Sequence, residues 1–427
     1  MSHYKPHPTY KDSGVERLGQ LPADWKVVPL KWLAVIRNGK DHKDVETLDG
    51  EFPVLGSGGE FARASQCMFS GESVLLGRKG TIDRPRYIDG PFWTVDTMFY
   101  TEIGRETNVK FFYYCALTIE FNRYATNTAL PSMTQEVLGQ IPFAMPSYTE
   151  QGRIATHLDR ETTRIDGLVS QKTRFIELLR EKRQAMISHA VTKGLDSRTP
   201  MKNLGIESLG DVPAHWKVTR VKYAIRSIEQ GWSPECESRP ADQGEWGVLK
   251  VGCVNGGVFR SEENKALPSA LTPRPDLVLK RGDVLVSRAN TRDLVGGCAV
   301  VEDDFPLLMI CDKLYRLNVD GDITTPAFLA ALIAVHGRRE VELEATGASA
   351  SMVNIAQSVI CNLRVALPPL EEQITIIAAI TERTRRYDTL ITTSERSIEL
   401  LKERRSALIT AAVTGQIDLR EPPDLLA

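Results

Sequence analysis

The sequence has no long apolar run, no leader-like beginning and no closely spaced pair of cysteines. The most apolar run, residues 327–335, has nine residues, whereas a membrane-spanning helix needs about 20. The first fourteen residues are polar, so we expect no secretory signal and a cytoplasmic location. None of the seven cysteines forms a CxxC pair, so we expect ordinary reduced thiols rather than a disulfide framework or a structural zinc site.

The sequence also lacks the motifs of several enzyme classes. It has no GxxxxGK(S/T) phosphate loop, no GxGxxG dinucleotide fingerprint, no HExxH pair and no (D/N)PP(Y/F) methyltransferase tetrapeptide. Pieces of a metal nuclease site, Pro275-Asp276 and Glu263-Asn264-Lys265, stand in reversed order and have no equivalent in the first half of the chain. We therefore expect no catalytic residue, no metal site and no cofactor on this chain.

The composition and net charge of the chain are typical of a globular protein with several domains. The 427 residues are enough for two or three domains, and 42% hydrophobic with 25% charged residues is ordinary for a globular protein. The formal net charge of −2 argues against a simple basic nucleic-acid binder, whose domains often have a pI above about 9. Contact with nucleic acid would therefore depend on local clusters of charge.

An internal duplication runs through the sequence. Residues 15–34, VERLGQLPADWKVVPLKWLA, match residues 206–225, IESLGDVPAHWKVTRVKYAI, at an offset of 191. Later matches are VLLGR with VLVSR at 210, WTVDTMFY with MICDKLYR at 216, Ser132-Met133 with Ser351-Met352 at 219, and residues 146–196 with 368–418 at 222. The offset only grows along the chain, which is typical of a duplication with longer loops in the second copy.

The duplication divides the chain into four segments. They are a variable domain over residues 1–145, a helical spacer over 146–197, a second variable domain over 198–366, and a second helical spacer with a C-terminal tail over 367–427. Short apolar runs rich in β-branched residues, bounded by Gly and Asp, predict two similar mixed α/β domains within an α+β chain. Trp25 and Trp216 stand at equivalent positions and are predicted to be structural anchors.

The two helical segments carry matching apolar stripes. Between residues 151 and 192 there is no proline, and apolar residues recur at spacings of three and four, the pattern of one side of a long helix. One such helix is marginal in water, so we expect the two to form an antiparallel coiled coil that makes the chain pseudo-two-fold. The charged runs Glu181–Arg183 and Glu403–Arg405 are interpreted as solvated faces. The predicted interface residues are Leu158, Ile165, Val169, Ile176, Leu179, Met186, Ile380, Tyr387, Ile391, Ile398, Leu401 and Leu408.

Polar side chains suited to nucleic acid lie near the predicted strand ends of both variable domains. Arg and Lys can pair with guanine edges and phosphates, and Asn can pair with adenine edges. A solubilising surface charge is an equally good interpretation of any one of them, but the repeat places Arg78 and Arg288 at equivalent positions. The candidate DNA-binding residues are Ser57, Arg63, Arg78, Lys79, Arg84, Arg86, Lys250, Asn255, Arg260, Arg288, Asn290 and Arg292.

Several motifs together resemble one known family. They are LGxxPxxW at each domain start, the GDVLVSR strand, the P-x-x-x-E-Q helix start at Pro368 to Gln373, and AVTGxID at Ala412 to Asp418. Degenerate copies of the last two stand at Pro146 to Gln151 and Ala190 to Asp196, where Lys193-Gly194 replaces the Gly-Gln of the second copy. With the order domain, helix, domain, helix, nearly the whole chain resembles the specificity subunit of type I restriction–modification systems.

The resemblance implies a non-catalytic DNA-binding role. Each variable domain would be a target recognition domain that reads one half of a bipartite, asymmetric site on double-stranded DNA, and the helices would set the spacer between the halves. Methyltransferase subunits, expected to be two, would supply S-adenosylmethionine, and restriction subunits would supply the ATP- and Mg-dependent steps. A scaffold of the same architecture that binds only proteins is the alternative.

Overall fold

The computed structural model describes residues 4–126, 131–203, 205–206, 209–337, 346–349 and 352–420. The chain divides into two compact units, called here unit 1 (residues 1–174 and 394–427) and unit 2 (residues 175–393). Each unit therefore contains one variable domain, the first part of the long helix that follows it and the last part of the other long helix. Every helix among the described residues is too short or too polar to cross a membrane.

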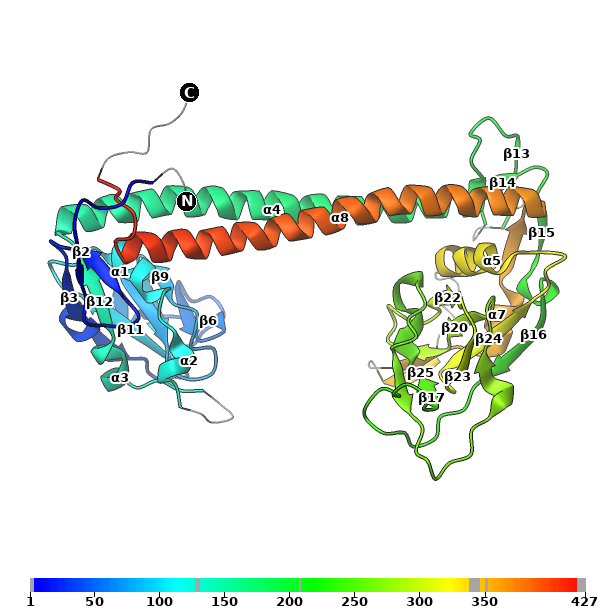
Figure 1. Cartoon of the computed structure of the whole chain (residues 1–427), viewed down its shortest axis with the longest axis horizontal. Helices are drawn as coiled ribbons and strands as arrows, with labels where there is room; N and C mark the ends of the chain where they lie inside the picture. The colour runs from blue at the N-terminus through cyan, green and yellow to red at the C-terminus, as the bar shows by residue number, and fades with distance from the viewer. Residues whose placement is uncertain are drawn as a thin grey trace. The chain divides into compact units, whose positions relative to one another are not determined.

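The variable domain of unit 1 consists of short strands and short helices (Figure 1). Its elements are β1 (Tyr10–Asp12), β2 (Gln20–Pro22), β3 (Lys26–Pro29), η1 (Leu30–Trp32), β4 (Ala34–Asn38), β5 (Phe52–Gly56), β6 (Gly59–Ala64), β7 (Phe69–Ser70), β8 (Ser73–Gly77), β9 (Arg86–Ile88), β10 (Pro91–Thr94), β11 (Met98–Ile103), α1 (Val109–Ala116), α2 (Phe121–Tyr124), α3 (Gln135–Gln140) and β12 (Pro142–Met145). The long helix α4 (Tyr148–Lys193) follows.

The variable domain of unit 2 has the same succession with longer insertions. Its elements are β13 (Met201–Asn203), β14 (Asp211–Pro213), β15 (Lys217–Arg220), η2 (Val221–Tyr223), β16 (Ile225–Gln230), β17 (Gly247–Leu249), η3 (Val251–Gly257), β18 (Asn264–Ala266), η4 (Pro275–Leu277), β19 (Val278–Leu279), β20 (Val284–Ser287), β21 (Ala289–Asn290), β22 (Cys298–Val300), β23 (Phe305–Met309), β24 (Leu314–Val319), α5 (Pro326–Leu332), η5 (Ile333–Gly337), β25 (Thr346–Ser349), β26 (Met352–Asn354), α7 (Gln357–Asn362) and β27 (Arg364–Leu367). The long helix α8 (Leu370–Val413) follows.

The sheets of the two domains correspond strand by strand. The antiparallel sheet β4-β11-β8-β9 of unit 1 matches β16-β24-β20-β22 of unit 2, and β6-β5-β10-β7 matches β18-β17-β23-β19. In the second pair, one parallel contact recurs, β5 with β10 and β17 with β23. The two-stranded ribbons β1-β2 and β3-β12 match β13-β14 and β15-β27. The predicted pair of similar mixed α/β domains is therefore confirmed.

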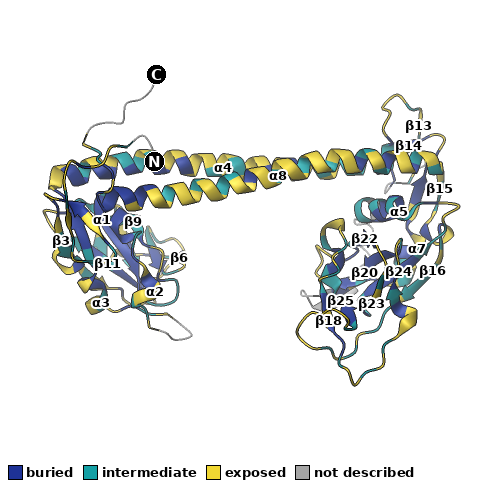
Figure 2. Cartoon of the chain, viewed as in Figure 1, coloured by how far each residue is buried: buried dark blue, intermediate teal, exposed yellow. Residues whose placement is uncertain are grey.

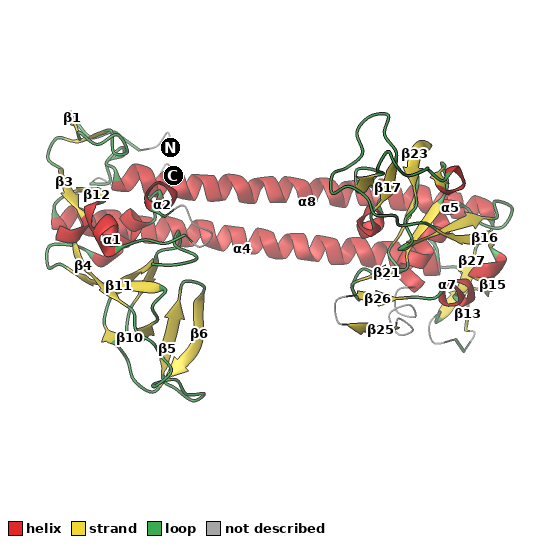
Figure 3. Ribbon diagram, turned by 90° about the horizontal axis from the view of Figure 1, so that it is seen from below, coloured by secondary structure: helices red, strands yellow, loops and turns green. Residues whose placement is uncertain are grey.

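The long helices pair in antiparallel fashion within each unit (Figures 1 and 3). In unit 1 the first part of α4 lies with the last part of α8, and in unit 2 the last part of α4 lies with the first part of α8. All twelve predicted interface residues are buried or half-buried, as the dark and teal stripe along both helices in Figure 2 illustrates. Leu158 and Leu408 are among the most buried, at 0% and 4% exposed.

Two equivalent ion pairs join the helices. Arg405 Nε lies 2.9 Å from Asp166 Oδ1 in unit 1, and Arg183 Nε lies 3.0 Å from Asp388 Oδ1 in unit 2. Both arginines belong to the charged runs that the sequence suggested were solvated faces. These two residues end the runs at seam positions, where a partly exposed cation meets a carboxylate of the other helix.

A buried glutamine explains the P-x-x-x-E-Q motif at the start of each long helix. The side chains of Gln151 and Gln373 are 2% and 0% exposed. Gln151 Nε2 donates to the carbonyl of Pro146 (3.1 Å), and its Oε1 accepts from the backbone N–H of Asn108, the N-cap residue of α1 (2.8 Å). Gln373 Oε1 accepts in the same way from Thr325, the N-cap residue of α5 (2.9 Å). Each glutamine thus fixes a long helix to its own domain.

The end of each long helix covers the tryptophan of the other repeat. Trp25 and Trp216 are 0% and 1% exposed, as expected of structural anchors. Gly415, which ends α8 with a φ of +72°, lies so close to Pro22 that a Cβ atom there would be 2.3 Å from the proline Cδ. Gly194, which ends α4 with a φ of +78°, lies in the same way against Trp216. A glycine is favoured at both positions because φ is positive, and at Gly415 the lack of space for a Cβ atom also requires it.

The structure corrects two details of the repeat. The backbone N–H of Met133 donates to the carbonyl of Arg78, and that of Ile355 donates to the carbonyl of Arg288, both at 2.9 Å. Met133 therefore corresponds to Ile355, at offset 222, and the match of Ser132-Met133 to Ser351-Met352 was wrong; Ser351 itself lies outside the described residues. The repeat also begins earlier than residue 15, because β1-β2 has its counterpart in β13-β14.

Candidate nucleic-acid interface

The same arrangement surrounds Arg78 and Arg288 at the ends of β8 and β20. Arg78 Nη1 donates to the carbonyl of Asp96 (3.2 Å), and its guanidinium lies 5.8 Å from the ring centre of Phe99. Arg288 Nη1 donates to the carbonyl of Asp312 (3.2 Å), with its guanidinium 5.7 Å from the ring centre of Tyr315. We call these two arrangements the arginine corners. An arginine held against a ring and a carbonyl is preorganised, so it loses little freedom when it binds a further acceptor.

Both corners are half-buried, and donors remain on their arginines. The Arg288 Nε is buried without a hydrogen-bond partner among the described residues. A guanidinium has five N–H donors, and one from each arginine goes to an aspartate carbonyl within its own domain. Those of the remaining donors that are accessible are suited to the carbonyl, ring nitrogen or phosphate oxygens of a nucleic acid.

Three further candidates gather near the first corner. Lys79 Nζ lies 3.7 Å from Asp96 Oδ2, so it shares that residue with Arg78. Arg86 Nη2 donates to the carbonyl of Gly58 (3.4 Å), in the same turn as Ser57. The backbone N–H of Ser57 in turn donates to Thr97, the neighbour of Asp96 (3.3 Å). The glycine-rich turn and the first corner therefore form one cationic patch.

Two candidates of the first domain lie elsewhere. Arg63 is exposed and forms an ion pair with Glu60 (3.5 Å), and it also donates to the carbonyl of Glu51 (3.3 Å). Arg84 is exposed, and no hydrogen bond or ion pair of its side chain is found within the described part of the chain. Among the candidate cations of this domain, Arg84 therefore has the fewest contacts within the described residues.

The asparagines predicted for the second domain are used inside it. Asn290 is 7% exposed, its Nδ2 donates to Asn255 Oδ1 and to Ser287 Oγ (both 3.4 Å), and its Oδ1 accepts from the backbone N–H of Thr291 (2.9 Å). An amide engaged on both sides cannot also form two bonds to an adenine unless those bonds break. Asn255, which is half-buried, is the more accessible of the pair.

The remaining candidates of the second domain lie before and after η3 and after β21. Lys250 Nζ lies 3.8 Å from Glu263 Oε2. Arg260 and Arg292 are both exposed on loops. The second domain thus presents its candidate cations just before η3, between η3 and β18, and after β21, whereas the first domain gathers most of its candidates around one corner.

The second corner includes polar residues that the candidate set missed. Gln230 Nε2 donates to the carbonyl of Asp312 (3.1 Å), and the backbone N–H of Asp312 donates to Ser233 Oγ (3.1 Å). Lys313 follows Asp312 directly and is half-buried. The signal was present in the sequence, because WTVDTMFY and MICDKLYR place Asp96 and Asp312 at equivalent positions.

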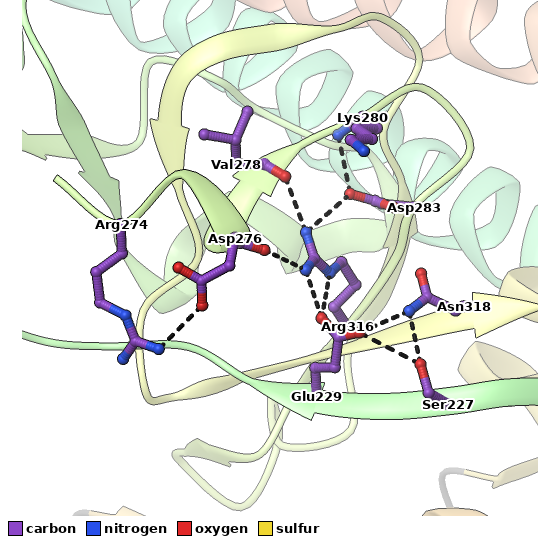
Figure 4. Close-up of polar contacts among 9 residues, drawn as sticks. All are labelled: Ser227, Glu229, Arg274, Asp276, Val278, Lys280, Asp283, Arg316 and Asn318. Atoms are coloured by element: carbon purple, nitrogen blue, oxygen red, sulfur yellow. Dashed lines mark hydrogen bonds and ion pairs between the residues drawn. The ribbon is translucent and has the colours of Figure 1, made fainter.

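Behind the second corner, Arg316 lies in a buried charged network (Figure 4). Its Nε lies 3.0 Å from Glu229 Oε2, its Nη1 donates to the carbonyl of Val278 (2.8 Å) and its Nη2 to that of Asp276 (2.7 Å). Asp283 Oδ2 is 3.7 Å from Nη1. Burial would raise the pKa of Glu229, but the hydrogen bonds and charge of Arg316 outweigh it and lower that pKa. Burial raises the pKa of Asp283.

The first domain has aromatic residues where the second has this network. Pairing of β4 with β11 and of β16 with β24 makes Tyr100 the counterpart of Arg316. Tyr100 lies 5.3 Å from Phe69 and 6.1 Å from Phe92 between ring centres. The two domains therefore share a backbone fold, but next to the arginine corner one has packed aromatic rings and the other has a charged network.

No metal or thiol site emerges from the part of the chain that the structure describes. No group of three or more His, Cys, Asp or Glu side chains there could hold a metal ion. The nuclease-like pieces do not converge, because Asp276 pairs with Arg274 (2.9 Å) and Glu263 with Lys250. Burial raises the pKa of Cys311 to about 11, so this thiol is not activated.

Comparison with known proteins finds similar proteins by sequence and by fold. The family model for the type I restriction modification DNA specificity domain matches residues 22–177. The EcoEI specificity subunit of Escherichia coli is 34% identical over 173 residues, which is 40% of this chain but only 29% of that relative. The MjaVIII specificity subunit of Methanocaldococcus jannaschii is 24% identical over 437 residues, covering 96% of this chain and 97% of the relative.

Solved structures show the same fold. A chain from a study of complex assembly and conformational transition of the type I R-M system has a TM-score of 0.69 at 16% identity, covering 93% of this chain and 99% of that one. The HsdS subunit from Thermoanaerobacter tengcongensis has a TM-score of 0.50 at 16% identity, covering 93% and 98%. With the duplicated domains, the paired helices and the motifs at their ends, the chain is similar to the specificity subunits of type I restriction–modification systems, in sequence and in fold.

Proposed function

We propose that this chain is the DNA-reading component of a type I restriction–modification complex. In this proposal, the domains at residues 1–145 and 198–366 are target recognition domains, and each binds one half of a bipartite site. The observation that carries the proposal is the pair of arginine corners. The same preorganised guanidinium recurs in both domains, as a pair of related DNA readers requires, while the surrounding side chains differ.

The two half-sites are proposed to differ in sequence. Lys79 follows the first corner arginine, whereas Ala289 follows the second. Thr97 and Lys313 also occupy equivalent positions beside the corner aspartates. Because base recognition depends on the donors and acceptors that reach each base edge, unlike surroundings favour an asymmetric site over a palindrome.

The helical segments at residues 146–197 and 367–427 are proposed to set the spacer between the half-sites. Each domain is fixed to its own long helix by Gln151 or Gln373, so the length of the helices governs how far apart two half-sites can be read. The twelve interface residues named above would form the seam of this spacer.

The partners are proposed to be double-stranded DNA, two methyltransferase subunits and restriction subunits, with the chain itself non-catalytic and in the cytoplasm, where the DNA is. S-adenosylmethionine, ATP and Mg would be bound by those subunits. Trp32 of η1 and Tyr223 of η2 support a partner present in two copies. They are 73% and 62% exposed, and they occupy equivalent positions of the repeat. Exposed aromatic side chains are frequent anchors of protein interfaces, and a duplicated anchor suits a duplicated partner.

Sequencing of modified bases in DNA methylated by the complex tests the function. The expected result is one bipartite motif with two unlike halves and a constant spacer. An unbroken palindrome would contradict the proposal. So would an absence of salt-dependent DNA binding by the chain with its methyltransferase subunits, which would leave a scaffold for proteins.

A further inference from the structure

A cavity of about 400 Å³ lies between α5 and the paired long helices of unit 2. Helix α5 lies against these helices in Figure 1. The side of α5 that faces the cavity carries only small side chains. The lining includes Ala327, Ala330 and Ala331 of α5 and Ile380, Thr381 and Thr384 of α8.

In unit 1 large side chains fill the equivalent place. Helices α1 and α5 correspond through their N-cap residues, each bound by the equivalent glutamine, so Lys110, Tyr113 and Tyr114 correspond to the three alanines. Lys110 forms an ion pair with Asp159. The hydroxyl of Tyr114 donates to Asp159 Oδ1 (2.7 Å) and lies 3.1 Å from Thr162 Oγ1. These contacts join the first variable domain to its long helix.

In unit 2 one half of this arrangement is missing. The lysine and both tyrosines are replaced by alanine, and Asp159 is replaced by Thr381. The hydroxyl partner of the tyrosine is retained, because Thr384 corresponds to Thr162, and Ile380 keeps the wall apolar. What remains is a wall suited to an aromatic ring, with hydroxyl groups where the phenol oxygen lies in unit 1.

We propose that this cavity receives a tyrosine side chain from a protein partner, and that unit 1, where the chain's own side chains fill the equivalent place, has no such site. Unit 1 indicates that the occupant is a tyrosine, because Tyr113 and Tyr114 of the chain itself lie at the equivalent place, between the short helix and the long helix. Binding sites are typically cavities of this size, and this one combines apolar walls with polar side chains such as Thr384 and Arg183, which suits a ring that carries a hydroxyl group. The inference rests on the proposed function only for the identity of the candidate partners, which are the methyltransferase and restriction subunits.

The first test uses p-cresol, which has the structure of a tyrosine side chain, with the full-length chain. Saturable binding is expected, with NMR shifts at the Ala331 and Thr384 methyl groups. The variant Ala331→Tyr/Thr381→Asp rebuilds the tyrosine–carboxylate pair of unit 1 and should abolish binding. As a matched control, Tyr114→Ala should create a second p-cresol site in unit 1. No binding by the wild-type chain, or equal binding by the filled variant, would overturn the proposal.

The second test measures assembly of the filled variant with each partner subunit. One partner should bind Ala331→Tyr/Thr381→Asp at least about tenfold more weakly than the wild-type chain, while the unfolding midpoint of the variant is no lower. Unchanged affinity for both partners would overturn the proposal. Failure of the wild-type chain with its methyltransferase subunits to bind DNA would contradict the proposed function instead, and the p-cresol result would not depend on that outcome.

Discussion

Arg183 Nε on α4 lies 3.0 Å from Asp388 Oδ1 on α8, and the duplication repeats this ion pair with the two helices exchanged. The counterpart of Asp388 is Asp166 and the counterpart of Arg183 is Arg405, and these two also pair, at 2.9 Å. Each unit therefore has one copy of the same bond, with the cation contributed by α4 in unit 2 and by α8 in unit 1. An isolated charged pair at a coiled-coil seam is best suited to fixing register.

Reversing one of these charges should weaken the seam modestly. Asp388→Arg places two cations together, and we expect the free energy of unfolding to fall by about 1 kcal/mol, because both side chains remain partly exposed. The double variant Arg183→Asp/Asp388→Arg should recover most of the loss in urea unfolding. A double variant as unstable as the sum of its single changes would show that the pair contributes no specific attraction.

Removing Arg316 should make the stability of unit 2 depend strongly on pH. Arg316→Met leaves Glu229 and the buried Asp283 without their cation, and we expect a loss of about 3 kcal/mol near pH 7. Without the cation, both folded-state carboxyl pKa values lie above their unfolded values of about 4, so the loss should be small near pH 4 and grow as pH rises. In the wild-type chain the pKa of Glu229 is lowered instead, so the ionised carboxylate stabilises the folded state above pH 4.5. This stabilisation is lost as the pH falls and the carboxylate becomes protonated.

Denaturant unfolding at several pH values measures this effect. Arg226→Met is the matched control, because Arg226 is an exposed arginine of the neighbouring strand, 3.3 Å from Asp320. It should cost less than about 1 kcal/mol at any pH. A loss in Arg316→Met that does not change with pH would mean that packing, and not charge, is what Arg316 contributes.

Arg84 and Arg292 should each affect one half-site. Both are exposed cations of the candidate interface, one in each target domain. We expect Arg84→Ala and Arg292→Ala each to lower the slope of log affinity against log salt by about one, as loss of one phosphate contact does. Duplexes with one scrambled half-site should assign each effect to a different half. Arg226→Ala should leave the slope unchanged, and equal losses in all three variants would indicate a general charge effect.

Shortening both long helices should change the spacer alone. Removing residues 171–177 and 393–399 deletes one heptad from each helix and keeps the spacing of the seam. Seven residues correspond to about 10 Å of helix, or about three base pairs. Modified-base sequencing should show both half-sites unchanged and a spacer shorter by about that amount. Altered half-sites with an unchanged spacer would refute a spacer role for the helices.

The sequence predicted the architecture because the duplication and the seam are regular. Spacings of three and four identify a helical stripe in one sequence, and the second copy supports the first. The alignment failed at Ser132-Met133, where two residues carry too little information and only the hydrogen bonds to the corner arginines reveal the true partners. The strand orders could not be read either, since they depend on contacts between distant segments.

Candidate side chains were harder to predict than architecture. Residue type suggests which side chains suit DNA, but burial is a property of the folded chain. Asn290 has an amide that could pair with adenine, yet this amide already donates hydrogen bonds to Asn255 and Ser287. The cavity in unit 2 could be found only by comparing two folded copies, because the alanines of α5 look like ordinary helix formers in sequence.

The covering of each tryptophan by the helix end of the other repeat has an evolutionary consequence. In a half-length ancestor with one domain and one helix, the residue equivalent to Trp25 would be exposed to solvent. The glycine-ended helix would have no tryptophan to pack against. In a dimer of two identical copies, the helix end of each copy would cover the tryptophan of the other. Such a homodimer would read two identical halves, and fusion of its genes would have freed each half to drift toward a different sequence.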